Sequence, residues 1–223
     1  PWPVRWRAIF QPAEETSTGA NDMIADGALE GIDAIFALHV DPSRELGKIG
    51  TRVGPLTSIT DELNIVIQGR GGHAARPHES QDPIAAAAQL ISSLYLFVPR
   101  GTDSHDPVVV TIGQIIGGES ANVIPEMVEL RGTLRTLTPK VQERTQSHIR
   151  QLARGLAESS GTKIRVEFIT GCGSVNNDPK LTAMVRRAGA DLLGEENVED
   201  IERPSMGAED FAQYLSHVPG TMF

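Results

Sequence analysis

Two adjacent carboxylates, Glu14 and Glu15, directly follow an apolar run that predicts a buried β-strand over residues 4–10. Adjacent acids repel, and a divalent metal would hold them together, because one carboxylate could coordinate the ion while the other took a proton from the water bound to it. His39, at the end of a second predicted strand over residues 34–40, is the candidate that completes the set.

A helix predicted over residues 19–28 lies between these two strands. A strand, helix and strand in this order almost always form a right-handed parallel βαβ unit, which brings the carboxyl ends of both strands to one edge of the sheet. We therefore expect Glu14, Glu15 and His39 to converge. Carboxylate oxygens and an imidazole nitrogen suit zinc, manganese, cobalt or nickel.

Each of these residues also has a common structural role. Glu14 and Glu15 would favour the start of the following helix, and His39 could be a hydrogen-bonded histidine at a strand end. Glu209 and Asp210 likewise predict the start of a helix near the end of the sequence. Because two ligands do not make a closed metal site, the residues alone leave both interpretations open.

In the middle of the chain the spacing of apolar residues changes, which predicts a separate domain. Asp82-Pro83 opens a helix in N-cap and first-turn order. In chain order, the predicted elements are a strand over 61–69, a helix from 82, strands over 107–116 and 127–137, a helix over 139–158 and a strand over 162–169. The order βαββαβ is the ferredoxin-like arrangement, with two helices on one face of an antiparallel sheet.

Composition narrows the class of protein. A formal net charge of −9 argues against nucleic acid or an anionic membrane as a partner, and a single cysteine excludes an internal disulfide. No apolar run approaches the length of a membrane span. These features predict a soluble, cytoplasmic protein whose partner is a small molecule.

Five segments together resemble one family. They are FQPAEE at residues 10–15, GANDMIADGALEGIDAIFALHV at 19–40, GRGGHAARPHESQDPIAAAA at 69–88, GGESANVIPEMVELRGTLRT at 117–136 and GAEDF at 207–211. In type and order they resemble the M20 metallopeptidase family, and more narrowly its aminoacylase and amidohydrolase branch of hippurate, N-acyl-amino-acid and auxin-conjugate hydrolases.

The resemblance implies an α/β fold, in which a catalytic domain with a βαβ sheet carries an inserted ferredoxin-like α+β lid that also mediates dimerisation. We place the incomplete catalytic domain at residues 1–57 and 171–223, and the lid at 58–170. By resemblance, Glu14 is the general base, Glu15 a metal ligand and His39 a ligand to a second metal. The complete protein is expected to bind two divalent ions per subunit.

The lid also has residues that match the family's motifs. His73 resembles the histidine that reaches the partner subunit's active site and polarises the scissile carbonyl, which makes a homodimer part of the mechanism. Asn122 and Arg135 resemble the residues that hold the substrate's carboxylate, a role that suits a guanidinium fork. Two alternatives concern these positions: Arg131 shares a strand face with Arg135, and Asn122 could be a turn residue that caps local backbone.

Some of the family's ligands have no counterpart in the sequence. Its Cys and His ligands lie in a His-x-Cys-Gly-His-Asp motif upstream of the two glutamates, and its last His ligand lies downstream of Glu-Asp-Phe. Cys172 lies far from the family's cysteine position. We therefore expect a fragment that binds catalytic metal weakly and does not itself hydrolyse N-acyl amino acids.

The predicted function of the complete protein is metal-dependent hydrolysis of the amide bond of N-acyl or N-aroyl amino acids by a metal-activated water. Two alternatives remain open. One is a truncated, catalytically inactive protein of this family that acts as a dimerising or binding module. The other is a dipeptidase or carbamoyl-amide hydrolase of the same family.

Overall fold

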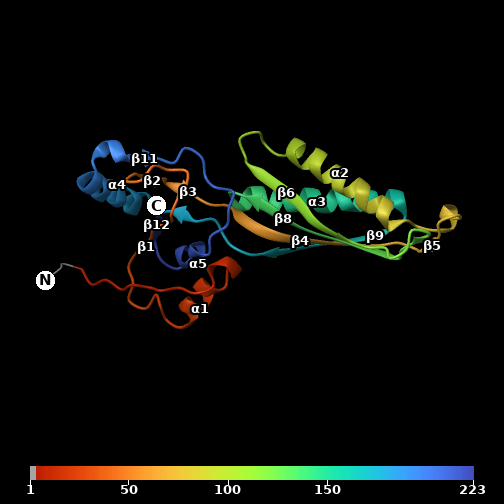
Figure 1. Ribbon diagram of the computed structural model, residues 1–223, viewed down its shortest axis with the longest axis horizontal. Coiled ribbons are helices and arrows are strands. Elements are labelled where there is room, and N and C mark those ends of the chain that lie inside the picture. Colours follow the sequence, from red (N-terminus) through yellow and green to blue (C-terminus); the bar gives the residue numbers. More distant parts are fainter. Residues whose placement is uncertain (1–3) are drawn as a thin grey trace. The chain divides into compact units, whose positions relative to one another are not determined.

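The structure is a computed structural model that describes residues 4–223, and the chain divides into two compact units (Figure 1). Unit 1 comprises Pro1–Ser58 and Cys172–Phe223, and unit 2 comprises Ile59–Gly171. Both units combine helices with strands, which confirms the predicted mixed α/β class.

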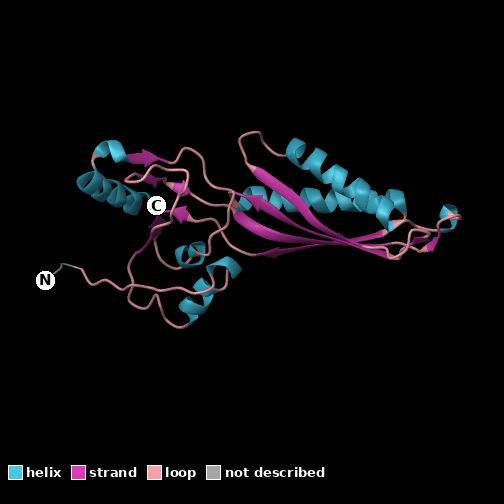
Figure 2. Cartoon of the chain, viewed as in Figure 1, coloured by secondary structure: helices cyan, strands magenta, loops and turns pink. Residues whose placement is uncertain are grey.

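Unit 2 contains a four-stranded antiparallel sheet and two long helices (Figure 2). Its main elements are β4 (Ile59–Gln68), α2 (Pro83–Gly101), β6 (Val108–Ile116), β8 (Met127–Thr136), α3 (Pro139–Ser160) and β9 (Lys163–Thr170). The strands lie in the order β6-β8-β4-β9, with all neighbours antiparallel. Both the βαββαβ chain order and this strand order are those of the ferredoxin-like arrangement.

The core of unit 2 lies between the sheet and the two helices. Alternate residues of β4 are buried, so Leu63, Ile65 and Ile67 face the helices while the residues between them face away. Leu90 of α2 and Ile149 of α3 belong to the same buried cluster. Each such side chain contributes about 1.5 to 3 kcal/mol when fully buried, so this cluster is the main source of stability in the unit.

Local signals in the sequence fix where α2 begins. The side chain of Asp82 accepts hydrogen bonds from the backbone N–H groups of Ile84 at 2.8 Å and Ala85 at 3.3 Å.

With 19 residues, α2 is by length and composition apolar enough to cross a membrane, so the expectation that no apolar run approaches that length was wrong. In this structure its buried stripe, which includes Leu90, Leu94 and Val98, packs in the core of unit 2.

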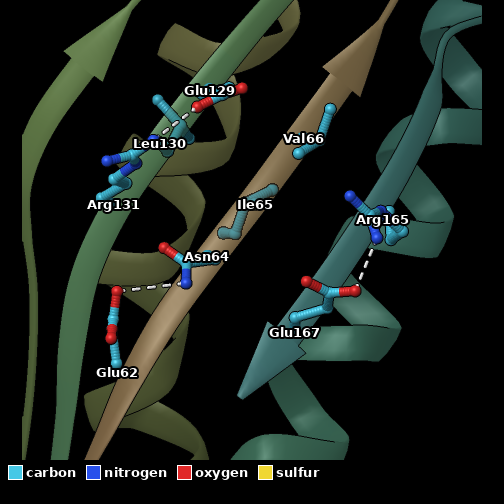
Figure 3. Close-up of a pocket in the computed structure, with 9 residues that line it drawn as sticks. All are labelled: Glu62, Asn64, Ile65, Val66, Glu129, Leu130, Arg131, Arg165 and Glu167. Carbon is cyan, nitrogen blue, oxygen red and sulfur yellow. Dashed lines mark hydrogen bonds and ion pairs between the residues drawn. The ribbon is translucent and has the colours of Figure 1, made fainter. Parts of the chain in front are cut away.

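The face of the sheet away from the helices is polar (Figure 3). Two ion pairs lie along individual strands: Glu129 with Arg131 at 3.1 Å on β8, and Arg165 with Glu167 at 2.6 Å on β9. Between them, the amide of Asn64 on β4 donates to Glu62 at 3.2 Å. Opposite charges are thus paired within this face, which gives it no strong preference for a charged ligand.

Unit 1 is built from short elements. They are η1 (Glu14–Thr16), α1 (Gly19–Ala25), β1 (Ile35–Ala37), β2 (Ile49–Thr51), β3 (Gly54–Pro55), β10 (Asn176–Asn177), α4 (Pro179–Leu193), η3 (Glu195–Asn197), β11 (Val198–Asp200), α5 (Phe211–Leu215) and β12 (Gly220–Met222). The pairs β1–β12 and β2–β11 are parallel, and β3–β10 is antiparallel. A second buried cluster, with Ala20, Val175 and Phe211 among its members, forms the core.

The predicted strand over residues 4–10 was wrong. These residues form no strand, and the side chains of Val4, Trp6 and Phe10 are 66%, 80% and 88% exposed. An apolar run becomes a strand only where a neighbouring strand pairs with its backbone, and no described residue does so here. The parallel partner of β1 is instead β12, so the predicted βαβ unit is also wrong.

Candidate active site

Three carboxylates lie close together in unit 1. One oxygen each from Glu14, Glu209 and Asp210 lies within 4.8 Å of the others. Glu209 and Asp210 are buried at the start of α5, and Glu14 is half-buried in η1. Like charges at this separation repel, so this acidic cluster favours either a proton or a cation in its midst.

The acidic cluster changes the chemistry of Glu14. Burial, followed by the negative charges of Glu209, Glu15 and Asp210, raises the pKa of this carboxyl above its usual value, and His39 opposes the shift. A carboxyl group whose pKa is raised toward neutrality exchanges protons more effectively near neutral pH, which is the property required of a general base. The same interactions show that Glu15 and His39 lie near enough to Glu14 to influence its charge.

The backbone around Glu14 is strained. Ala13 and Ser17 bracket η1, and both have a φ of 56°, in the left-handed region that residues other than glycine rarely adopt. The loop closes with a hydrogen bond from Ser17 N–H to Glu14 O at 2.7 Å. Strain of this kind persists only where surrounding contacts enforce it, and it is often found at functional sites.

His39 is oriented for ligation through one ring nitrogen. It follows β1, and its backbone N–H donates to Phe223 O at 2.9 Å. Its Nδ1 lies 2.8 Å from Val40 O, and because a carbonyl only accepts, Nδ1 is the donor. The proton on Nδ1 leaves the lone pair on Nε2, the arrangement typical of a metal-binding histidine.

The carboxylate of Glu15 and the imidazole of His39 are donor types that fit divalent metal ions. Across residues 4–223, however, the acidic cluster is the only group of three or more potential ligands that the structure brings together, and it includes neither Glu15 nor His39. Each of these two residues supplies one donor, fewer than the three protein ligands typical of a catalytic zinc.

His73 lies in unit 2, where β5 (Gly72–His73) pairs with β7 (Val123–Ile124). The backbone N–H of Ala75 donates to His73 Nδ1 at 3.1 Å, so Nδ1 is the acceptor. In the neutral ring, Nε2 then carries the hydrogen. An exposed imidazole in this tautomer can donate to a developing oxyanion.

Asn122 lies beside His73, whereas Arg135 does not. Ala74 N–H donates to Asn122 O at 3.0 Å, and Ser120 Oγ donates to Asn122 Oδ1 at 2.7 Å. Arg135 pairs with Thr60 at the opposite end of β4, about 27 Å from Gln68 at the rise of an extended strand. The two residues expected to hold the carboxylate are thus separated by the length of the sheet, and no single chain can place both on one carboxylate.

Sequence reasoning missed two residues beside the acidic cluster. Burial raises the pKa of the Cys172 thiol, a shift opposed by a hydrogen bond with Ser17 and reinforced by the charge of Asp210. Burial also raises the pKa of the Tyr214 hydroxyl, and the negative charge of Asp210 raises it further. This hydroxyl has no hydrogen-bond partner among the described residues. The position of Tyr214 four residues after Asp210 on a predicted helix was the signal that could have found it.

Gln11 is a third residue whose role the sequence did not reveal. Its Nε2 donates to both carboxylate oxygens of Asp210, at 2.7 and 2.8 Å. Both residues lie within sequence segments that resemble family motifs, but nothing in those motifs shows that the two segments are in contact in the folded chain.

Two bacterial deacetylases are similar in sequence to nearly the whole of this chain. It is 40% identical over 214 residues to the N-acetylcysteine deacetylase of Bacillus subtilis (strain 168), with 96% of this chain and 56% of the relative covered. It is 39% identical over 217 residues to the N-acetyldiaminopimelate deacetylase of Shouchella clausii (strain KSM-K16), with coverage of 96% and 58%. The chain thus spans little more than half the length of these relatives.

A solved structure shares the fold. The chain matches the crystal structure of the Bacillus subtilis YXEP protein, described as a dinuclear metal binding peptidase from the M20 family, with a TM-score of 0.80 and 34% identity. The match covers 96% of this chain and 53% of that structure. Residues 2–223 match Peptidase family M20/M25/M40. The chain therefore belongs to that family, as its motifs predicted.

Proposed function

We propose that the full-length protein carrying this chain is a metal-dependent amidohydrolase that cleaves the amide bond of N-acyl or N-aroyl amino acids. The observation that carries this proposal is the placement of Glu14 in the acidic cluster, with its pKa raised, in a strained loop beside Glu15 and His39. Relatives named as deacetylases of N-acetylcysteine and N-acetyldiaminopimelate support the substrate class.

The chain's own residues have distinct roles in the proposed reaction. Glu14 takes a proton from the attacking water, whose oxygen bonds to the carbonyl carbon, and returns it to the amine as the C–N bond breaks. Divalent ions held in part by Glu15 and His39, and of the zinc, manganese, cobalt or nickel type, would supply the Lewis acidity that lowers the pKa of that water. Donation from His73 Nε2–H stabilises the oxyanion.

The substrate's carboxylate is the proposed partner of Asn122 and Arg135. A guanidinium binds a carboxylate through two parallel hydrogen bonds, and an amide N–H adds a third. Because the sheet separates these residues in one chain, a shared carboxylate would need one from each of two chains. This requirement supports a homodimer in which His73 and Asn122 serve the active site of the second chain.

The edge of unit 2 formed by β6 supports the same assembly. β6 is an edge strand, and Ile115 and Ile116 on it are exposed. On α2, the adjacent side chains of Leu96 and Phe97 are also exposed. The backbone N–H of Ile112 donates to the hydroxyl of Tyr95 at 2.9 Å, so this part of α2 adjoins the edge strand. We propose that a second copy covers this α2–β6 surface, because a two-fold axis lets one surface pair with itself.

The proposed function is tested with the full-length protein and its Glu14→Gln variant. The wild type, loaded with zinc, manganese, cobalt or nickel, should release amino acid from a panel of N-acetyl and N-benzoyl amino acids. The variant should keep its metal, measured by elemental analysis, and lose kcat by orders of magnitude, because only proton transfer is removed. Wild-type kcat in Glu14→Gln would overturn the role of Glu14. Cleavage of dipeptides or N-carbamoyl amino acids but not of N-acyl amino acids would favour the alternative activities.

The 223-residue chain by itself supports a second proposal. Among its described residues, no group of three or more potential ligands includes Glu15 or His39. We infer that this chain alone binds metal weakly and acts as a dimerising or binding module. Metal-dependent turnover by the purified 223-residue chain would contradict this inference.

A further inference from the structure

The loop that carries Glu14 and Glu15 is held at both ends by one carboxylate, that of Asp210. Gln11, just before the loop, donates its Nε2 to both oxygens of Asp210 at 2.7 and 2.8 Å. Ala20, just after the loop, donates its backbone N–H to Asp210 Oδ2 at 3.1 Å. Asp210 is only 1% exposed, so these hydrogen bonds replace the water that a carboxylate would otherwise bind.

The loop needs such an anchor because its backbone is strained. A left-handed conformation at a residue other than glycine costs about 1 to 3 kcal/mol, and the loop contains two, at Ala13 and Ser17. Ser17 N–H donates to Glu14 O at 2.7 Å, but the bonds that join the two arms of the loop, from the N–H groups of Thr18 and Gly19 to Ala13 O, are both long at 3.4 Å. Contacts from outside the loop therefore have to help hold its two arms together.

The close approach of the loop's two arms shows how tightly it is closed. A Cβ at Gly19 would lie 1.7 Å from Pro12 O, so only glycine fits there. Pro12 follows Gln11 and Gly19 precedes Ala20, so the two arms meet directly beside the carboxylate that binds both. Asp210 is thus at the point where the loop closes.

Resting on the proposed function, we propose that Asp210 is a positioning residue, whose carboxylate joins Gln11 to the Ala20 N–H and thereby holds the strained loop that presents Glu14 to the substrate. Hydrogen bonds to a charged acceptor are stronger than those between neutral groups, which suits this task. The role is separate from that of Glu209, whose Oε1 accepts from the Phe211 N–H at 3.1 Å within the start of α5.

Asp210→Asn tests the proposal, because an amide retains the shape of the carboxylate but has one acceptor oxygen instead of two. Gln11→Met removes the donor while keeping Asp210, and is the second variant should Asp210→Asn fail to fold. The matched control is Asp191→Asn, which makes the same change at an exposed position of α4 in the same unit.

The first measurement needs no substrate. Hydrogen exchange at the backbone amides of Ser17, Thr18 and Gly19 should be faster in Asp210→Asn and in Gln11→Met than in the wild type or the control, while exchange in α4 stays the same. Unchanged exchange in this loop in both variants would overturn the proposal. Because this measurement does not use activity, it decides the matter even if the wild type hydrolyses no N-acyl amino acid, a result that would overturn the proposed function alone.

The second measurement is steady-state kinetics of the full-length protein at a temperature at which each variant is folded. A misplaced base should lower kcat about ten- to a hundredfold with little change in KM, because the substrate still binds. Adding Ala13→Gly to Asp210→Asn should raise kcat again, since glycine adopts a positive φ without strain and the loop needs less support. A variant that loses thermal stability but keeps wild-type kcat would show a purely structural role and overturn the proposal.

Discussion

Asp61, at the start of β4, accepts a hydrogen bond from Gln142 Nε2 at 2.8 Å although its carboxylate is almost completely buried. Gln146 Nε2 and Thr170 Oγ1 donate to the same carboxylate, both at 2.9 Å. These neutral donors join β4, α3 and β9 at one end of the sheet. A buried carboxylate that is satisfied by hydrogen bonds alone makes the packing of α3 on this end of unit 2 depend on a few donors.

Asp61→Asn should lower the free energy of unfolding by about 1 to 3 kcal/mol. The new NH2 group can only donate, and it would face side chains that are themselves donors, so buried hydrogen bonds would be lost. Urea denaturation measures the change as a lower midpoint. Glu143→Gln, an exposed acid-to-amide change on α3, is the matched control and should leave the midpoint nearly unchanged. Equal midpoints in the two variants would mean that the Asp61 hydrogen bonds contribute nothing to stability.

Glu14 should make the metal-free protein less stable as the pH rises. Its pKa in the folded state is raised above the value near 4.5 of the unfolded chain, so the folded state binds more protons between these two values. Stability therefore falls as the pH rises through that window, and the loss remains at higher pH. Glu14→Gln removes this loss.

The difference in Tm between Glu14→Gln and the wild type, measured with a chelator from about pH 4 to about pH 8, should be positive and increase with pH before it levels off. Glu30→Gln, at an exposed position of the same unit, is the control. A difference in Tm that is constant over this range would show that the raised pKa of Glu14 is absent in solution.

Glu15→Ala and His39→Ala should each reduce the metal bound per subunit of the full-length protein, because each removes one direct donor. Elemental analysis after dialysis against a fixed free-metal concentration gives the stoichiometry. The exposed surface histidine His78 provides the control His78→Ala, which should bind as much metal as the wild type. Full metal occupancy in both test variants would refute the ligand assignment.

Two inactive variants should complement each other if His73 serves the second chain. Mixing full-length His73→Ala with Glu14→Gln under conditions of subunit exchange gives mixed dimers in which one active site has both side chains intact. Activity should rise on mixing, and each variant exchanged with itself is the control. Failure to recover activity, with mixed dimers demonstrated by mass spectrometry, would exclude the exchange of His73 between chains.

Leu96→Glu and Phe97→Glu should weaken the proposed dimer, because each places a charge in the apolar α2–β6 surface. Sedimentation velocity at several concentrations should show a shift toward the monomer. Leu192→Glu puts the same charge at an exposed leucine of α4 in unit 1 and should leave the distribution unchanged. If all three variants sediment like the wild type, the dimer does not use this surface.

The elements of unit 2 could be predicted from the sequence to within a few residues because their signals are local. Strand alternation such as that of β4 needs only its own residues, and helices begin at side-chain caps, as at Thr138, whose Oγ1 accepts from Val141 N–H at 3.4 Å. The end of α3 also has a local signal, since Gly161 adopts a φ of 70° at its C-cap.

Unit 1 was predicted less well because its pairing is distant in sequence. Three-residue strands such as β1 carry too little periodicity to reveal a partner, and the apolar character of residues 4–10 gave a strand that has no neighbour. The residue types and order of Glu14, Glu15 and His39 predict that they lie close together, and the structure places Glu15 and His39 near Glu14. The contact between Asp210 and Gln11 could not be predicted, because 199 residues separate them.

The discontinuity of unit 1 has a consequence for biosynthesis. Unit 2 is one continuous segment and can fold as soon as it leaves the ribosome, whereas β1 has to wait for β12, which follows more than 180 residues later. At typical translation speeds of about 5 to 20 residues per second, that delay is about 10 to 40 s. During this time the segment that contains Glu14 and His39 lacks its native neighbours and is open to chaperones and proteases. The order of synthesis therefore lets unit 2 fold before the segment that contains Glu14 and His39 can pair with β12.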